Sequence, residues 1–210
     1  GGGVRIAFAN GHSAEADVAI GADGVHSAVK SILFGEAPPN VTGRIAYRTT
    51  FPAKLLNGFE MDECAKWWGE DRHIVMYYVK PDRSEVYFVT SQPEPEFGLE
   101  SWSAEGDVAV LRAAFEGFHP SVQRVLAACP SVHKRILVDR EPLAEWSAGN
   151  VVLLGDAAHP MTPYMAQGAA MAIEDAAVLS RCLGGADRDS VAAALATYEA
   201  TRKERTSRIQ

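Results

Sequence analysis

The fold is decided by one stretch of the sequence, which reads Val151-Val152-Leu153-Leu154-Gly155-Asp156-Ala157-Ala158-His159-Pro160 and continues as Met161-Thr162-Pro163-Tyr164-Met165-Ala166-Gln167-Gly168-Ala169-Ala170. Its four apolar residues are typical of a buried strand, and the Gly-Asp pair indicates a tight turn. An alanine-rich helix is predicted from about 167 to 183. Small residues at a helix start let a flat ligand approach backbone amides, which favour negative charge. At the carboxyl end of the strand, Asp156 is placed to accept hydrogen bonds from ligand hydroxyls.

Composition limits the classes of protein to which this chain can belong. It has 210 residues, of which 47% are hydrophobic and 22% charged, as in ordinary globular proteins. The formal net charge of -7 argues against binding to nucleic acid or to an anionic membrane surface. Cys64, Cys129 and Cys182 form no CxxC pair, so we expect no disulfide framework and no metal site. This use of cysteine fits a protein of the reducing cytoplasm best. The longest apolar run, 151–154, is far too short to span a bilayer.

Local patterns divide the chain into three blocks. The first, residues 1–40, has a predicted hairpin of strands 4–8 and 16–20 around Asn10-Gly11, followed by a helix over 27–34. The middle block, residues 41–145, is predicted to contain strands 41–52, 73–79, 85–90 and 132–140, helices 108–118 and 122–128, and a loop over 92–98. The last block, residues 146–210, contains strand 151–154, the alanine-rich helix and a final helix. We therefore predict an α/β fold of mixed α+β character, with a mixed or antiparallel sheet in the middle block.

A second motif near the amino end makes the first one specific. It reads Ala16-Asp17-Val18-Ala19-Ile20-Gly21-Ala22-Asp23-Gly24-Val25-His26-Ser27-Ala28-Val29. Together the two motifs resemble the DG and GD motifs of the FAD-dependent aromatic-ring hydroxylases, which have the p-hydroxybenzoate hydroxylase fold. The resemblance implies that blocks 1–40 and 146–210 are parts of a Rossmann-like FAD-binding domain, and that block 41–145 is a substrate-binding domain. The FAD-binding residues that it implies are Asp23, Gly24, Gly155, Asp156, Pro160, Gln167, Gly168 and Ala169.

Two departures from the family pattern stand out. The family begins with a GxGxxG unit that holds the FAD diphosphate, and no such unit with a following helix occurs here. Where the family often has arginine, this chain has Lys30, which keeps the charge and loses a bidentate fork. Both ends of the sequence fall inside predicted elements. We therefore expect an internal piece of a longer protein that by itself holds flavin weakly or not at all.

The middle block carries the predicted substrate side. The stretch from Trp67 to Tyr78 is similar to the branch of the family that contains 6-hydroxynicotinate 3-monooxygenase and salicylate hydroxylase, as is the segment 100–103. Strand alternation puts His73, Val75 and Tyr77 on one face of the sheet. The resemblance implies that His73 acts as a base or hydrogen-bond partner for the substrate hydroxyl, and that Tyr77 orients the ring. Tyr164 stands where this branch often has histidine.

The resemblance also implies a reaction. NADH or NADPH reduces FAD, the reduced FAD takes up O2 to form a C4a-hydroperoxide, and its distal oxygen attacks a small hydroxy-aromatic or N-heteroaromatic acid. Alternatives within the same fold are a ubiquinone-pathway hydroxylase and a flavin halogenase. A further alternative is a non-catalytic fragment that acts as an interaction module. The expected partners are a small aromatic acid and O2, with no nucleic acid and no membrane, and a homodimer is left open.

Several other residues have a purely structural interpretation. Asp23 and Asp156 can be turn residues, His73 a half-buried structural histidine, and Tyr77 part of the core. We expect His159 to brace its loop, and Trp67, Trp68, Met165, Met171 and Ile173 to pack in the interior. No role is assigned to Glu174-Asp175, and the basic stretch 202–205 is interpreted as a solvated helix face.

Overall fold

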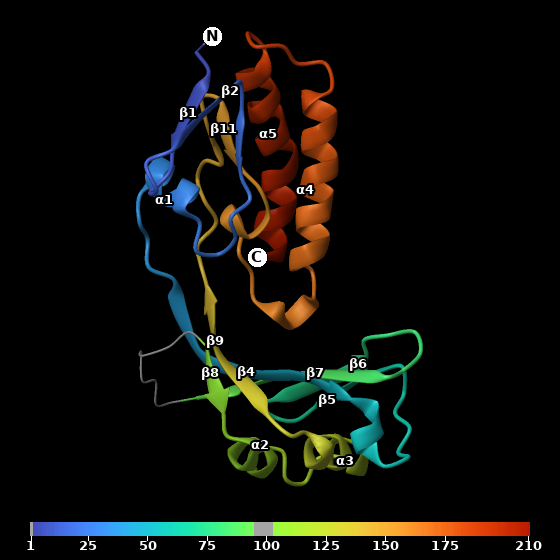
Figure 1. Cartoon of the computed structure of the whole chain (residues 1–210). Helices are drawn as coiled ribbons and strands as arrows, with labels where there is room; N and C mark the ends of the chain where they lie inside the picture. Colours follow the sequence, from blue (N-terminus) through green and yellow to red (C-terminus); the bar gives the residue numbers. More distant parts are fainter. Residues whose placement is uncertain (1, 95–102) are drawn as a thin grey trace. The chain divides into compact units, whose positions relative to one another are not determined.

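The computed structural model of the chain describes residues 2–94 and 103–210 and divides into two compact units (Figure 1). The first unit contains residues 1–40 and 138–210, and the second contains residues 41–137. The chain therefore leaves the first unit once and returns to it, so that sequence motifs from both ends share one unit. Residues 95–102 lie outside the described part, and with them most of the loop predicted at 92–98 and of the segment 100–103.

The first unit opens with a short hairpin of β1 (Val4–Ala7) and β2 (Ser13–Ala16). The two strands are antiparallel, with Val4 opposite Ala16 and Ala7 opposite Ser13. The prediction that residues 16–20 form the returning strand is therefore wrong. The return is made earlier, because Gly11 adopts a φ of 86° and the chain closes through a hydrogen bond from the Phe8 amide to the His12 carbonyl.

The two sequence motifs meet in a three-stranded sheet. Strand β3 (Ala19–Gly21) lies parallel to β11 (Val151–Leu153), with Ile20 opposite Val152, and β10 (Ser147–Ala148) pairs with the other edge of β11. A Cβ atom on Gly21 would lie 2.8 Å from side-chain atoms of both Leu153 and Val29. Glycine is therefore required where α1 (Ala28–Phe34) packs over this sheet.

Two long helices complete the first unit. After the short 3-10 helices η2 (Gly155–Ala157) and η3 (Pro163–Met165), α4 (Gly168–Leu183) packs against α5 (Val191–Ile209). Their core contains the buried residues Trp146, Val152, Leu153, Leu179, Leu195 and Tyr198. Of the described helices, none combines the length and the apolar character that a bilayer span requires.

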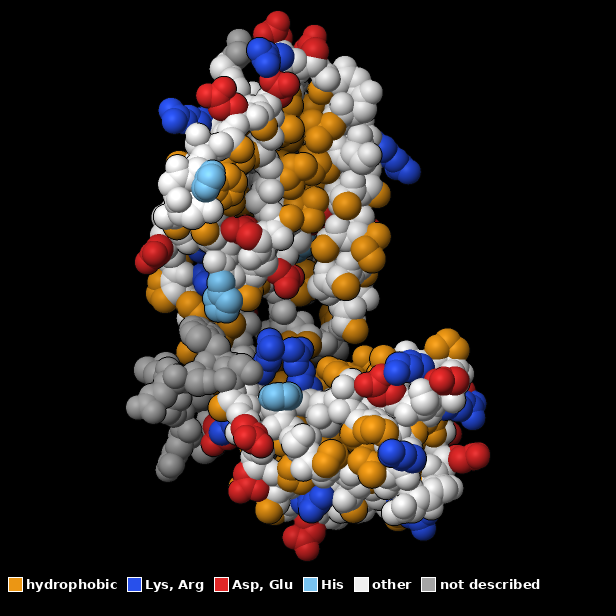
Figure 2. Space-filling view, in the orientation of Figure 1, with side chains coloured by type: hydrophobic (Ala, Val, Ile, Leu, Met, Phe, Trp, Pro, Cys, Tyr) orange, Lys and Arg blue, Asp and Glu red, His pale blue; other side chains and the backbone are white. Residues whose placement is uncertain are grey.

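Apolar side chains also reach the surface of the first unit, as Figure 2 shows. Met171 is fully buried, as predicted. The same prediction is wrong for Met165 and Ile173, which are 64% and 71% exposed. Met165 lies in the short helix η3, and Ile173 lies on the face of α4 opposite to Met171 and Asp175.

The described part of the second unit is a six-stranded sheet with two α-helices and one short 3-10 helix. Its strands are β4 (Asn40–Pro52), β5 (Cys64–Trp68), β6 (His73–Tyr78), β7 (Glu85–Pro93), β8 (Ser103–Gly106) and β9 (Val132–Asp139), in the order β5-β6-β7-β4-β9-β8. Its helices are η1 (Ala53–Leu56), α2 (Val108–Ala114) and α3 (Pro120–Ala128). The predicted antiparallel pairing of β6 with β7 is confirmed, with Val75 opposite Val89. Residues 92 and 93 continue β7 and are not part of a loop.

The two faces of this sheet differ in character. Ile74, Met76 and Phe88 are buried on one face, in a core that includes Leu111 of α2 and Val125 of α3. The predicted alternation along β6 is thereby confirmed, since His73, Val75 and Tyr77 occupy the other face. Trp68, expected in the interior, is 69% exposed on the edge strand β5. Its ring lies beneath the Lys66 ammonium, 4.1 Å from the ring centre.

Candidate functional site

The turn after β11 is held in an unusual backbone conformation. Gly155 has a φ of 62°, which L-residues with a side chain rarely adopt. A Cβ atom at this position would also approach the Ala172 Cβ of α4 to 3.1 Å. The turn therefore lies directly against α4, and it leaves Asp156 exposed. A Cβ atom on Gly168, at the start of α4, would lie 3.8 Å from the Asp156 carboxylate.

The second half of the motif at 16–29 forms a local cap. The Asp23 carboxylate accepts a hydrogen bond from the Ser27 hydroxyl at 2.6 Å and from the Val29 amide at 3.1 Å. Ser27 in turn accepts from the Lys30 amide at 2.8 Å and so caps α1. Burial tends to raise the pKa of Asp23, but these hydrogen bonds lower it overall. Both carboxylate oxygens of Asp23 are thus engaged in the structure of the turn, and Gly24 adopts a φ of 78°.

A pocket of about 230 Å³ opens beside the turn after β11. Asp156, Pro160 and Lys30 line it together with Arg140 and Val25. Burial, together with the nearby Arg140 guanidinium, lowers the pKa of Lys30. The other residues predicted to bind the cofactor are absent from the lining of this pocket; they are Asp23, Gly24, Gly155, Gln167, Gly168 and Ala169.

The amino end of α4 is open. Its N-cap residue, Gln167, makes no side-chain hydrogen bond to the helix, and the first bond of the helix runs from the Met171 amide to the Gln167 carbonyl. The amides of residues 168–170 therefore have no partner within α4, which gives this end a partial positive charge. Gly168 and Ala169 are among these backbone donors, Gln167 is the N-cap residue, and Gly168 lies near Asp156.

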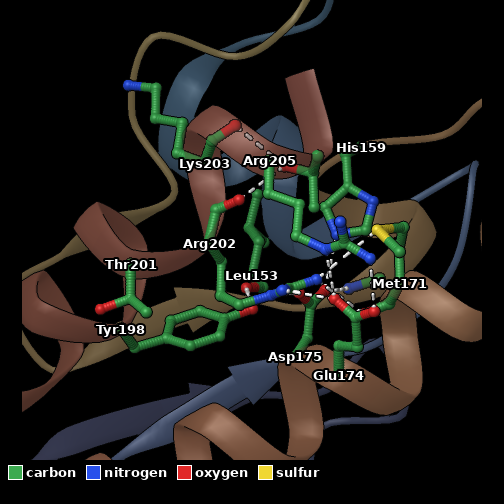
Figure 3. Close-up of polar contacts among 12 residues, drawn as sticks. Leu153, His159, Met171, Glu174, Asp175, Tyr198, Thr201, Arg202, Lys203 and Arg205 are labelled. Atoms are coloured by element: carbon green, nitrogen blue, oxygen red, sulfur yellow. Dashed lines mark hydrogen bonds and ion pairs between the residues drawn. The ribbon is translucent and has the colours of Figure 1, made fainter. Parts of the chain in front are cut away.

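Behind the turn lies a buried carboxylate, Asp175, that no sequence motif singled out. Asp175 of α4 is completely buried, and Figure 3 shows its polar contacts. Its Oδ2 atom accepts from the Gly155 amide at 3.1 Å and from His159 Nε2 at 2.6 Å, and its Oδ1 atom accepts from Arg202 Nε at 2.7 Å. The pKa of Asp175 is lowered, because the hydrogen bonds from His159, Arg202 and Gly155 outweigh the effect of burial.

The interpretation of stretch 202–205 as a solvated helix face is wrong for its first residue. Arg202 is 4% exposed and also donates to the Glu174 carboxylate at 2.7 Å. Glu174 accepts two further bonds from Arg205, at 2.7 and 2.8 Å, and these arginines lower the pKa of Glu174 to about 2. The spacing of the apolar residues along α4 could have predicted that Asp175 is buried. Asp175 is four residues from both Met171 and Leu179, so it shares their buried face.

His159 braces the loop, as predicted. Its ring bonds to Asp175 through Nε2 and lies beside the Trp146 ring, with 5.0 Å between ring centres. Because the acceptor is a carboxylate, the geometry assigns the proton to Nε2. Burial and the nearby Asp175 carboxylate raise the pKa of Tyr198, whose hydroxyl donates to the Leu153 carbonyl. Carboxylate, imidazole, guanidinium and indole groups therefore form one buried network beneath the turn.

The predicted substrate residues lie in the second unit. His73 is buried on β6, opposite Trp68 and Ser91 of the neighbouring strands. Burial and the charges of Lys66 and Arg44 lower the pKa of His73.

Tyr77 is half-buried on the same face and packs against Tyr87, with 5.0 Å between ring centres and the rings tilted by 44°. Burial raises the pKa of Tyr77, and Tyr87 and Cys64 add to the effect. Near neutral pH, this face of the sheet therefore offers an imidazole with a lowered pKa and a protonated phenol.

Known proteins resemble this chain over nearly its whole length. Residues 9–210 match the model of the family described as FAD binding domain. A 6-hydroxynicotinate 3-monooxygenase from Bordetella bronchiseptica is 48% identical over 209 residues, which are 99% of this chain and 54% of that protein. A salicylate hydroxylase in a substrate complex has a TM-score of 0.85 at 28% identity, covering 99% of this chain and 56% of its own.

A third match contains the cofactor. HpxO of Klebsiella pneumoniae, in complex with FAD and uric acid, has a TM-score of 0.82 at 30% identity and covers 99% of this chain and 52% of its own. These matches confirm the resemblance drawn from the motifs at 16–29 and 151–170, together with the α/β fold class. The chain spans about half the length of the relatives that it matches.

Proposed function

This chain belongs to the FAD binding domain family, and we propose that the protein that carries it is an FAD-dependent monooxygenase of a small hydroxy-aromatic or N-heteroaromatic acid. The proposed co-substrates are O2 and NADH or NADPH. One observation carries the proposal: the chain is 48% identical to a 6-hydroxynicotinate 3-monooxygenase over 99% of its length. The geometry adds support, because acidic, basic and helix-terminal groups gather around the turn at Gly155-Asp156.

The groups around this turn fit FAD. Asp156 is exposed at the edge of the pocket and can accept hydrogen bonds from the ribityl hydroxyls. Lys30 and Arg140, which line the same pocket, supply two positive charges for the diphosphate. The open amino end of α4 favours negative charge on the ring system. Asp23 and Gly24 would act indirectly, since their contacts shape the start of α1, which presents Lys30.

When FAD is bound, it supplies the hydride-accepting and oxygen-transferring chemistry. The protein residues then have to hold the substrate and manage its proton. His73, whose pKa is lowered, is neutral near pH 7 and can accept the proton of a substrate hydroxyl. The Tyr77 phenol, whose pKa is raised, stays protonated and can donate a hydrogen bond that orients the substrate. Removal of the hydroxyl proton makes the ring richer in electrons and so favours attack by an electrophilic oxygen.

The first test is a titration of the 210-residue chain with FAD, followed by quenching of flavin fluorescence. Dissociation constants in the micromolar range or below would support the proposed cofactor site. We expect Asp156→Ala to weaken binding about 10-fold or more, since it removes a charged acceptor. Asp17→Asn is the matched control, because Asp17 is an exposed carboxylate of the same unit and lies outside the pocket. Equal affinities for the two variants would contradict the assignment of Asp156.

The second test addresses the substrate residues in the longer protein that carries this chain. NADH or NADPH oxidation is followed with a panel of hydroxylated aromatic acids. We expect His73→Gln to lower the rate at least 100-fold, in the range of general base catalysis. With His73 intact, the rate should fall as the pH drops through a value below 6.5, because protonation removes the base. A rate that stays constant as the pH is lowered from neutrality until the protein unfolds would contradict this role.

A further inference from the structure

We propose that Asp175 is the positioning residue of the Gly155-Asp156 turn, and that Arg202 of the last helix holds its carboxylate in place. The C-terminal helix α5 thereby determines where Asp156 is presented. The proposal rests on the proposed function in one respect only, namely that Asp156 contacts FAD. Its structural part, the link from α5 through Asp175 to the turn, stands on contacts within the first unit.

Three segments of the first unit meet at the Asp175 carboxylate. Asp175 binds the Gly155 amide of the turn, the His159 ring of the following loop, and the Arg202 guanidinium of α5 (Figure 3). Both carboxylate oxygens are used, and the Asp175 side chain is completely buried. A carboxylate with three donors in a buried setting has little freedom to move. It can therefore fix the segments that bind it.

The Gly155 amide lies beyond the end of β11, and the Asp175 carboxylate accepts its hydrogen bond at 3.1 Å. Gly155 itself has a φ of 62°. The Cα atom of Gly155 is also confined, because even a Cβ atom would crowd Ala172. The hydrogen bond from the Gly155 amide to Asp175 and the contact with α4 together set the direction in which the chain continues to Asp156. Without this hydrogen bond, the chain could leave the turn in other directions.

A buried carboxylate is stable only when a cation pairs with it. Arg202 supplies the cation, and it also contacts Glu174, which is in turn bound by Arg205. The charges of the two carboxylates and the two guanidiniums in this network balance. Arg202 also donates to the Met171 carbonyl at 3.4 Å, so its guanidinium spans three acceptors that a lysine could not reach together.

Arg202, which holds the Asp175 carboxylate, comes from α5 and lies in the last ten residues of the sequence. The groups that we expect to touch FAD come from other segments, namely the turn after β11, α1, the start of α4 and Arg140. A change at Arg202 should therefore weaken FAD binding, although Arg202 is absent from the lining of the pocket. Weaker FAD binding by a folded Arg202 variant distinguishes a positioning role from a general contribution to stability.

The test combines a readout at the turn with a readout of the cofactor. In the unaltered chain, a long-range NMR correlation between the Gly155 amide and the Asp175 carboxyl carbon should report their hydrogen bond directly. In Asp175→Asn we expect the Gly155 amide resonance to shift and its exchange with solvent to speed up about 10-fold. The Tyr198 amide should stay protected if the variant is folded. The control is Asp17→Asn, an exposed carboxylate of the same unit.

Arg202→Lys provides a milder second variant that keeps the charge. We expect it to shift the Gly155 amide in the same direction and less far, and to weaken FAD binding less than Asp175→Asn does. An unaltered chain that lacks the Gly155–Asp175 correlation would overturn the proposal, with no variant needed. So would folded variants in which the Gly155 amide and the FAD affinity both stay unchanged.

The cofactor arm separates this proposal from the proposed function. If the unaltered chain fails to bind FAD, the proposed cofactor site is in question, and the NMR arm still decides whether Asp175 and Arg202 hold the turn. If the chain binds FAD and Asp175→Asn binds about 10-fold more weakly, both proposals are supported. If FAD binds to the unaltered chain and the turn moves in Asp175→Asn with no loss of affinity, the positioning role in binding is wrong.

Discussion

Replacing Arg202 with methionine should show how much of the stability of the first unit depends on the buried ion pair. Methionine keeps most of the side-chain length, so the main loss is the cation that pairs with Asp175. The side chain of Arg202 is 5% exposed and that of Asp175 is 0% exposed, so the remaining carboxylate would stay in the interior without its guanidinium partner. Breaking such a pair by removing one member costs about 3–5 kcal/mol.

Arg205→Met is the matched control for this experiment. Arg205 lies on the same helix and binds the same Glu174, but its side chain is 54% exposed. Water already solvates this pair, and exposed pairs contribute little to stability. We therefore expect Arg205→Met to leave the unfolding midpoint close to that of the unaltered chain. The two variants differ chiefly in burial and in the contact with Asp175.

The assay is urea denaturation of the chain labelled with 5-fluorotryptophan, so that Trp146 has a resonance of its own among the 4 tryptophans. Trp146 is buried in the first unit beside His159 and Tyr198 and therefore reports the unfolding of that unit. With a slope of about 2 kcal/mol per molar urea, the expected loss in Arg202→Met lowers the midpoint by about 2 M. Equal, small shifts for both variants would refute the reasoning that the buried charge of Asp175 depends on Arg202.

Three further predictions use the same denaturation assay. Gly155→Ala should cost about 1–2 kcal/mol, because alanine at a φ of 62° is strained and its Cβ would crowd Ala172; an unchanged midpoint would contradict this. Ser27→Ala should cost about 1 kcal/mol and speed hydrogen exchange at the Lys30 amide that it caps, whereas an amide that stays protected would argue against the cap. Glu174 has a folded pKa of about 2 against an ordinary 4.5, so its contribution is fully present above pH 4.5 and is lost as the pH falls towards 2. Glu174→Gln should therefore flatten the fall in stability over that range, and a fall as steep as before would assign it to other carboxylates.

The local elements around the two motifs were predictable because their signals are short-range. The helix at 28–34 begins with a serine cap and ends at Gly35, where the φ is 82°. The alternation of β6 placed His73 and Tyr77 on one face from the sequence alone. The first hairpin was misjudged at its return, since residues 16–20 carry an alternating pattern that fits two different partners. Which partner strand binds such a segment is decided by the whole unit.

The buried network around Asp175 and Arg202 was likewise not predictable from local sequence signals. A Glu-Asp pair and a basic run near the end of the chain are typical of solvated helix faces, and for Arg205 that interpretation holds in part. Asp175 and Arg202 differ because α4 and α5 pack face to face and bury both side chains. A separation of 27 residues gives no local sign of the pairing. Only the packing of the two helices brings the carboxylate and the guanidinium to 2.7 Å.

The sequence by itself determined the class of fold, the two motifs, and the shared face of His73 and Tyr77, because composition, alternation and turn chemistry act between near neighbours. The resemblance carried by the motifs then made Asp156, His73 and Tyr77 candidate site residues. Tertiary structure alone decided three further features. It paired β3 with β11 and so joined two motifs that lie far apart in the sequence. Such a separation is beyond the reach of local sequence signals. It engaged Asp23 in a local cap. It also turned Asp175 towards the Gly155 amide, because burial leaves a carboxylate no water and its donors must then come from other parts of the chain.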